Sequence, residues 1–182
     1  MRTTLVIALC VAAAFAGIET LESGAQKPAP AADPVLVMDT AKGPIEIRLF
    51  PADAPKSVEH ILGLVRRNFY RGLRIHRLTP TIVQWGDPLS RDVSRKDSWG
   101  SGGSGTPIGV AEFSKRRTHQ RGTVSLAHAG RAEFADSQLF ILKAGNKGYD
   151  GKHVIIGQVT SGMGVVDKLA PADVIKNITI KP

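Results

Sequence analysis

Residues 122–142 read GTVSLAHAGRAEFADSQLFIL, and this stretch decides the fold class. It holds two short runs of strand-forming residues, 122–127 and 138–142, joined by a connection rich in small and polar residues. Similar short runs occur along the rest of the chain, at 35–39, 45–49, 74–78, 153–159 and 174–180. At 45–49, Ile45, Ile47 and Leu49 alternate with polar residues, which predicts a strand with one buried face.

Only two segments have a helical pattern. Val58, Ile61, Leu62 and Val65 follow the i, i+3, i+4, i+7 spacing of an amphipathic helix that begins in 53–57 and ends near residue 68. A second, shorter helix is predicted over 163–170. Many short strands with long connections and two helices favour a mainly β fold, a closed or nearly closed antiparallel barrel.

The 182 residues suit one domain preceded by a removable segment. Arg2 is followed by an apolar run at 5–18, which is too short for a comfortable membrane span and is typical of a secretory signal peptide. We predict a signal peptide at 1–25, a flexible lead-in at 26–34 and one domain at 35–182. An uncleaved N-terminal anchor is the alternative. After cleavage we expect no stable membrane insertion and an exported protein, periplasmic or secreted.

Several other functions lack support in the sequence. The formal net charge is +8, but the clusters of basic residues are not interleaved with aromatic residues, so no nucleic-acid binding is expected. The five histidines show no HxH or HxxxH spacing, so no metal site is predicted. Residues 100–105 (GSGGSG) match GxGxxG without a preceding strand or a following helix, which argues for a flexible loop and against a nucleotide cofactor.

Three separated segments carry the functional signal. They are 75–88 (IHRLTPTIVQWGDP), 122–127 (GTVSLA) with 137–141 (SQLFI), and 150–157 (DGKHVIIG). In this order they closely resemble the cyclophilin family of peptidyl-prolyl isomerases, over residues 35 to 182. The resemblance implies an eight-stranded antiparallel barrel capped by two α-helices, with a groove on its outer face. It also implies an enzyme that acts on proline-containing unfolded or flexible chains. We expect a monomer that needs no cofactor.

The resemblance assigns roles to nine residues of this sequence. The residues implied in catalysis are Arg77, Gln84, Gln138, Phe140 and His153, with Arg77 as the central cation and Phe140 as the floor of the proline pocket. Those implied in substrate binding are Ile82, Ala127, His128 and Tyr149. The backbone near Ala127 and His128 would pair with the residues that precede the proline. Where the family has an aromatic pocket residue, this chain has Thr81 and Ile82.

The residue chemistry agrees with this assignment. Alternation along a strand places Gln138 and Phe140 on one face, so a polar group and an aromatic ring can line the same groove. A guanidinium such as that of Arg77 can stabilise the twisted amide, in which the prolyl nitrogen has regained its lone pair. A non-catalytic peptide-binding or chaperone module on the same fold is the alternative, because the pocket lacks an aromatic residue at 81–82.

Overall fold

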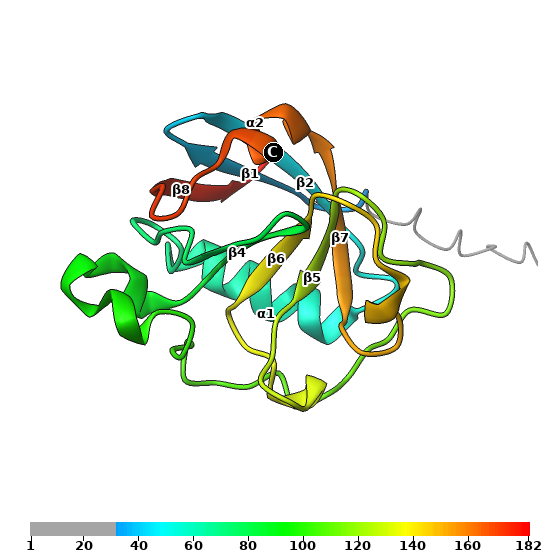
Figure 1. The fold of residues 1–182 in the computed structure, drawn as a ribbon. Coiled ribbons are helices and arrows are strands. Elements are labelled where there is room, and N and C mark those ends of the chain that lie inside the picture. Colours follow the sequence, from blue (N-terminus) through cyan, green and yellow to red (C-terminus); the bar gives the residue numbers. More distant parts are fainter. Residues whose placement is uncertain (1–31) are drawn as a thin grey trace, which may run out of the picture. The chain divides into compact units, whose positions relative to one another are not determined.

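The structure is a computed structural model that describes residues 32–182. Eight strands form one sheet in the order β3-β4-β6-β5-β7-β2-β1-β8, and every neighbouring pair is antiparallel (Figure 1). The strands are β1 Val35–Thr40, β2 Gly43–Leu49, β3 Arg77–Leu78, β4 Ile82–Trp85, β5 Thr123–Leu126, β6 Leu139–Leu142, β7 Ile155–Ser161 and β8 Ile175–Ile180.

Two α-helices accompany the sheet, as the periodicity predicts. Helix α1 (Pro55–Arg66) buries Val58, Ile61, Leu62 and Val65 in the same apolar core that holds the inner side chains of the strands. Helix α2 (Met163–Lys168) contributes Val166 to that core. Short 3₁₀ helices occupy the connections: η1 Pro88–Arg91, η2 Val93–Ser98, η3 Ala132–Phe134 and η4 Lys147–Tyr149. Two of these helices, η1 and η2, give regular structure to the polar, basic segment 89–99 (LSRDVSRKDSW).

The prediction of a closed barrel is wrong, because the sheet is curled but its end strands β3 and β8 do not pair with each other. Strand β3 has two residues, so it cannot run along the six-residue β8. In the described part of the chain, the two ends of the sheet are connected by one isolated bridge, between Arg74 and Val174, which precede β3 and β8. The amide of Gly72 also donates to the carbonyl of Ile175 at 2.9 Å. The predicted strand 74–78 is accordingly shortened to Arg77–Leu78.

Strand β4 is absent from the sequence-based expectations, and it carries two residues of the groove. All four of its residues are buried, so the alternation of apolar and polar residues that reveals a half-exposed strand is missing. Val83 and Trp85 belong to the main core, whereas Ile82 belongs to a separate apolar cluster on the other face. Trp85, which has no role in the sequence-based assignment, is a fully buried core residue.

The predicted signal peptide and most of the lead-in lie outside the described residues. Among residues 32–182, no helix is both long enough and apolar enough to cross a membrane.

Candidate active site

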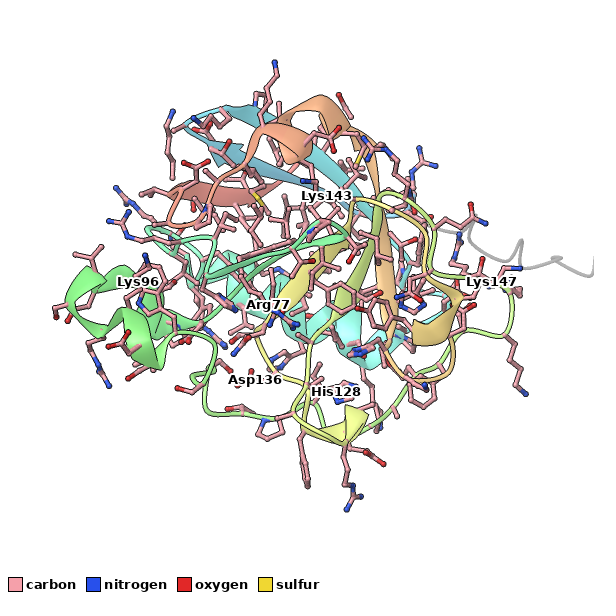
Figure 2. All side chains as sticks on the ribbon, in the orientation of Figure 1. Arg77, Lys96, His128, Asp136, Lys143 and Lys147 are labelled. Carbon is pink, nitrogen blue, oxygen red and sulfur yellow. The ribbon has the colours of Figure 1, made fainter. Side chains whose placement is uncertain are left out.

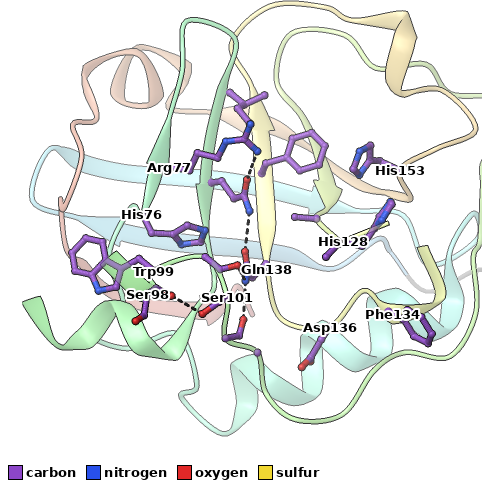
Figure 3. A pocket seen from close by; sticks show the side chains of 18 of the residues that line it. His76, Arg77, Ser98, Trp99, Ser101, His128, Phe134, Asp136, Gln138 and His153 are labelled. Atoms are coloured by element: carbon purple, nitrogen blue, oxygen red, sulfur yellow. Dashed lines mark hydrogen bonds between the residues drawn. The ribbon is translucent and has the colours of Figure 1, made fainter. Parts of the chain in front are cut away.

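All nine residues named from the sequence line one groove of about 1240 Å³ (Figure 3). Strands β4 and β6 supply Ile82, Gln84 and Phe140, and β3 supplies Arg77. The other residues come from the connections that follow β5 or precede β6 and β7. Residues separated by more than seventy positions in the sequence, such as Arg77 and His153, thus face a common space.

A row of polar side chains runs along the groove. Arg77 and Gln84 are paired across β3 and β4, and Arg77 Nη1 donates to Gln84 Oε1 at 3.4 Å. Gln84 Nε2 donates to Gln138 Oε1 at 2.9 Å, and Gln138 Nε2 donates to the carbonyls of Gly100 and Gly102 at 2.8 and 2.7 Å. The side-chain amides of Gln84 and Gln138 each both donate and accept a hydrogen bond in this row. The row therefore orients the exposed guanidinium of Arg77 before a substrate arrives.

An apolar pocket lies beside this row. Ile82, Phe140 and Leu142 form a buried cluster distinct from the main core, with Ala127 and Tyr149 packed against it. The Phe140 ring makes edge-to-face contacts with Tyr149 at 5.6 Å and with His153 at 5.2 Å between ring centroids. Such a cluster, apolar and open to the groove on one side, has the chemistry to receive a pyrrolidine ring.

The pocket wall at residues 81–82 is formed by Ile82 and not by Thr81. Thr81 is exposed, and its amide donates to Thr79 Oγ1 at 3.2 Å within the β3–β4 turn. Ile82 pairs with Leu142 across β4 and β6, which turns its side chain toward Phe140.

The backbone after β5 offers one edge of the groove. The amide of Ala127 donates to the carbonyl of Gln138 at 2.9 Å, so that amide is already engaged. Within residues 32–182, neither the carbonyl of Ala127 nor the amide of His128 takes part in a backbone hydrogen bond. These two groups are free to pair with an extended peptide.

His153 and His128 stand together at that end of the groove, with ring centroids 4.5 Å apart (Figure 3). His153 Nδ1 lies 3.0 Å from the carbonyl of Leu126, and His128 Nε2 lies 2.8 Å from the carbonyl of Lys152. Burial lowers the pKa of His153 below its ordinary value, although the bond to Leu126 opposes this. The imidazole is therefore neutral at pH 7.

This shift predicts a specific pH profile. We expect kcat/KM to be flat from pH 8 to about 6.5, the ordinary histidine pKa, and to fall at lower pH as His153 is protonated. A charge on His153 would be unfavourable beside the apolar pocket. His153→Gln should remove this acidic limb, whereas His128→Gln should retain it. An acidic limb that persists unchanged in His153→Gln would contradict the assignment.

The sequence did not reveal a buried hydrogen-bond chain beneath the pocket. His119 Nδ1 lies 2.7 Å from Asp150 Oδ1, and its Nε2 lies 3.0 Å from Ser125 Oγ. These contacts resemble those of a serine hydrolase triad, but Ser125 is fully buried and no substrate could reach it. The rings of His119 and Phe140 are nearly parallel, with their centroids 6.5 Å apart. This chain of hydrogen bonds therefore helps to position Phe140, the floor of the pocket.

A second carboxylate fixes the glycine-rich loop. Asp136 accepts hydrogen bonds from Ser104 Oγ at 2.5 Å and from the amide of Gly105 at 3.0 Å, and it lies 3.0 Å from His60 Nε2 of α1. Burial alone would raise the pKa of Asp136, but these contacts outweigh it and lower the pKa. With Gln138 bound to Gly100 and Gly102, residues 100–105 form an anchored wall of the groove rather than the free loop expected.

Acid should weaken this anchor. Since the folded-state pKa of Asp136 lies below its unfolded value, it stabilises the fold above about pH 4, and this contribution is lost as the pH falls through the folded-state pKa. We expect Asp136→Asn to lower the free energy of unfolding by about 2 kcal/mol at pH 7. The difference should vanish near pH 2 in urea titrations. An equal difference at both pH values would show that the charge is irrelevant.

Comparisons with known proteins agree with this geometry. The family described as "Cyclophilin type peptidyl-prolyl cis-trans isomerase/CLD" matches residues 35–181. A peptidyl-prolyl cis-trans isomerase of Helicobacter pylori is 35% identical over 142 residues, covering 76% of this chain and 82% of the relative. A probable isomerase of Brucella suis is 35% identical over 93% of this chain and 89% of its own. Peptidyl-prolyl cis-trans isomerase B of Bacillus subtilis is 33% identical, and the match covers 75% of this chain and 90% of the relative.

Among solved structures, a Cryptosporidium parvum cyclophilin type isomerase, crystallised in the presence of the dipeptide Ala-Pro, has the same fold. The TM-score is 0.71 at 24% identity, over 81% of this chain and 99% of that one. With the ordered motifs, the sheet and the groove, these matches lead to one conclusion: the chain belongs to the cyclophilin-type peptidyl-prolyl cis-trans isomerase family.

Proposed function

We propose that the chain accelerates rotation about X-Pro bonds of unfolded or flexible exported polypeptides, at the groove between Arg77 and His153. The observation that carries this proposal is the hydrogen-bonded row Arg77–Gln84–Gln138 running directly beside the apolar pocket of Ile82 and Phe140. A proline ring in that pocket would present its amide bond to the guanidinium.

The mechanism follows from the amide bond itself. Resonance imposes a rotation barrier of about 18–20 kcal/mol, and twisting the bond returns the lone pair to the prolyl nitrogen. An N–H of Arg77 that donates to this lone pair binds the twisted state more strongly than the planar one. Lowering the barrier by about 5 kcal/mol would accelerate rotation by roughly 10³- to 10⁴-fold. No σ bond is made or broken, so the reaction requires neither a nucleophile nor a cofactor.

The alternative is a non-catalytic peptide-binding or chaperone module on the same fold. It depended on the missing aromatic residue at 81–82, and Ile82 fills that wall of the pocket with an apolar side chain. The test is the refolding of a protein whose slow phase is limited by proline isomerisation. We expect catalytic amounts of the chain to accelerate that phase. A chaperone would act only at stoichiometric amounts.

Export is proposed from residues 1–25 and is tested separately. Proline isomerisation takes tens to hundreds of seconds and can limit folding, so a compartment in which newly exported chains fold would use this activity. Fractionation of the host cell, followed by N-terminal sequencing of the purified protein, should find the mature chain outside the cytoplasm and beginning at Gln26. A cytoplasmic protein that begins at Met1 would contradict this assignment.

A further inference from the structure

The connection between β6 and β7 borders one end of the groove and carries an excess of positive charge. It reads KAGNKGYDGKHV at 143–154, and Tyr149 and His153 from this segment line the groove. Its three lysines lie outside the groove walls, and we call them the lysine rim: Lys143, Lys147 and Lys152. The catalytic assignment uses none of these charges.

Two lysines of the rim adjoin the rings at this end of the groove. Lys152 precedes His153 in the chain, and its carbonyl lies 2.8 Å from His128 Nε2. Lys147 begins η4, whose last residue, Tyr149, packs against the apolar pocket cluster. A peptide bound across these rings would therefore pass close to both lysines.

The third lysine adjoins the apolar pocket at the end of β6. Lys143 follows Leu142 of the pocket cluster, and its amide donates to the carbonyl of Thr81 at 2.7 Å. Figure 2 shows Lys143 above Arg77 and Lys147 at the right of the molecule. The rim is therefore spread along the β6–β7 connection rather than gathered at one point.

The charges of the rim are not neutralised within the structure. Lys147 and Lys152 are exposed, Lys143 is half-buried, and none of the three forms an ion pair among residues 32–182. The one carboxylate of the segment, that of Asp150, accepts from the amide of His119 at 2.8 Å and lies 2.7 Å from its Nδ1. These bonds lower the pKa of Asp150, and the charge of Lys147 contributes. Three ammonium groups thus accompany a single carboxylate that is already engaged.

The backbone that carries the rim is held in place before a ligand binds. The amide of Asn146 donates to the carbonyl of His119 at 2.9 Å. The amides of Lys152 and His153 both donate to the carbonyl of Tyr149, each at 3.0 Å. Because the loop is already ordered, little more than the lysine side chains must lose conformational freedom when an anion binds.

The chemistry of this end of the groove indicates an acidic polypeptide as the ligand. Several cations at one end of a binding site favour carboxylates and disfavour other cations, through contacts that salt screens. The neighbouring groove offers an apolar pocket and the unpaired backbone groups of Ala127 and His128, which suit a peptide rather than a nucleic acid.

We propose that Lys147 and Lys152, with Lys143 beside them, bind an aspartate or glutamate side chain close to the isomerised proline, so that the chain favours acidic segments of its substrates. That the ligand is a substrate peptide rests on the proposed function. The binding of a carboxylate rests on the unpaired lysines and on the ordered loop that carries them at the edge of the groove.

The test uses the full chain and Ala-Ala-Ala-Pro-Ala-Ala-Ala peptides in which glutamate replaces each alanine in turn. Matched peptides carry glutamine, the neutral isostere, or lysine at the same position. Affinity is measured by NMR titration and kcat/KM by exchange NMR. We expect glutamate to bind about three- to fivefold more tightly than glutamine at one or two neighbouring positions, and lysine more weakly than both. High salt should bring the ratio of glutamate to glutamine close to one.

Variants locate the effect. Lys147→Gln and Lys152→Gln should each lower the ratio, and the double variant should bring it close to one. Replacing both lysines with glutamate should invert the preference, so that the lysine peptide binds best, which a merely structural role of the lysines would not produce. Lys42→Gln removes the charge of an exposed lysine in the β1–β2 turn, outside the 143–154 segment, and should leave the ratio unchanged.

The outcomes separate this proposal from the proposed function. A ratio near one at every position, in a chain that isomerises the peptides, would overturn the carboxylate site alone. An equal preference for glutamate at every position, lowered as much by Lys42→Gln as by Lys147→Gln, would reflect the net charge of the protein and overturn the site as well. If no peptide is isomerised but glutamate still binds more tightly through Lys147 and Lys152, the site stands and the catalytic assignment fails.

Discussion

Arg77→Ala should reduce kcat/KM for an Ala-Pro test peptide by roughly 10²- to 10³-fold, the usual cost of losing one donor that acts on the transition state. Arg77 lies on the exposed side of the groove, and its contact with another side chain is the bond to Gln84, so the fold should tolerate its removal. Arg77→Lys keeps the charge but loses the planar fork of donors, and it should recover only a small part of the rate.

The control is Arg95→Ala, which removes an exposed arginine of η2 that does not line the groove. This variant should retain the wild-type rate. Circular dichroism and thermal unfolding establish that all three variants are folded. If folded Arg77→Ala kept more than a third of the wild-type kcat/KM, donation from Arg77 could not be the principal source of catalysis.

Gly86→Ala should produce the largest change in stability, lowering the free energy of unfolding by about 3 kcal/mol. Gly86 follows β4 with φ +106°, a conformation that other residues rarely adopt. A Cβ at this position would lie 2.2 Å from the carbonyl oxygen of Ser137 and 2.8 Å from the Cα of Gln138. Relief of this clash must displace Gln138, so the variant should also lose activity at temperatures where it remains folded.

Gly63→Ala is the matched control for the same added methyl group. Gly63 lies within α1, and apart from its chain neighbours and the nearby backbone of the helix no atom lies within 4 Å of the position its Cβ would take. The substitution should stabilise the protein by about 0.5–1 kcal/mol, because alanine loses less conformational entropy than glycine in a helix. Urea unfolding of the two variants decides the matter. A Gly86→Ala protein as stable as the wild type would show that the β4–β6 contact is less tight than described.

Local patterns in the sequence predicted most of the elements, and failed where burial hides the pattern. The alternation of Ile45, Ile47 and Leu49 identified β2, and the helical spacing from Val58 to Val65 identified α1. Strand β4 has both faces covered, so Gln84 was identified through the family motif without the strand that holds it. Closure of the sheet depends on β3, whose length no local pattern fixes.

The groove was predicted through ordered motifs, whereas its supporting contacts were not. His119 joins Ser125 of β5 to Asp150, which lies 25 residues further along the chain, and their separation in the sequence gives no signal. Trp99 lies in a polar, basic stretch that resembles an ordinary surface loop. Its place in the groove follows from the buried carboxylate of Asp87, which draws Gly100 against the polar row. Such contacts between distant segments require the three-dimensional structure.

The most direct test of the central claim is the rate of cis-to-trans conversion of an Ala-Pro peptide with increasing amounts of the wild-type chain. The proposed function predicts a rate that rises in proportion to the concentration of the protein, at substoichiometric amounts, until it far exceeds the spontaneous rate. A folded wild-type chain that binds the peptide in the groove and leaves the rate unchanged would contradict the claim.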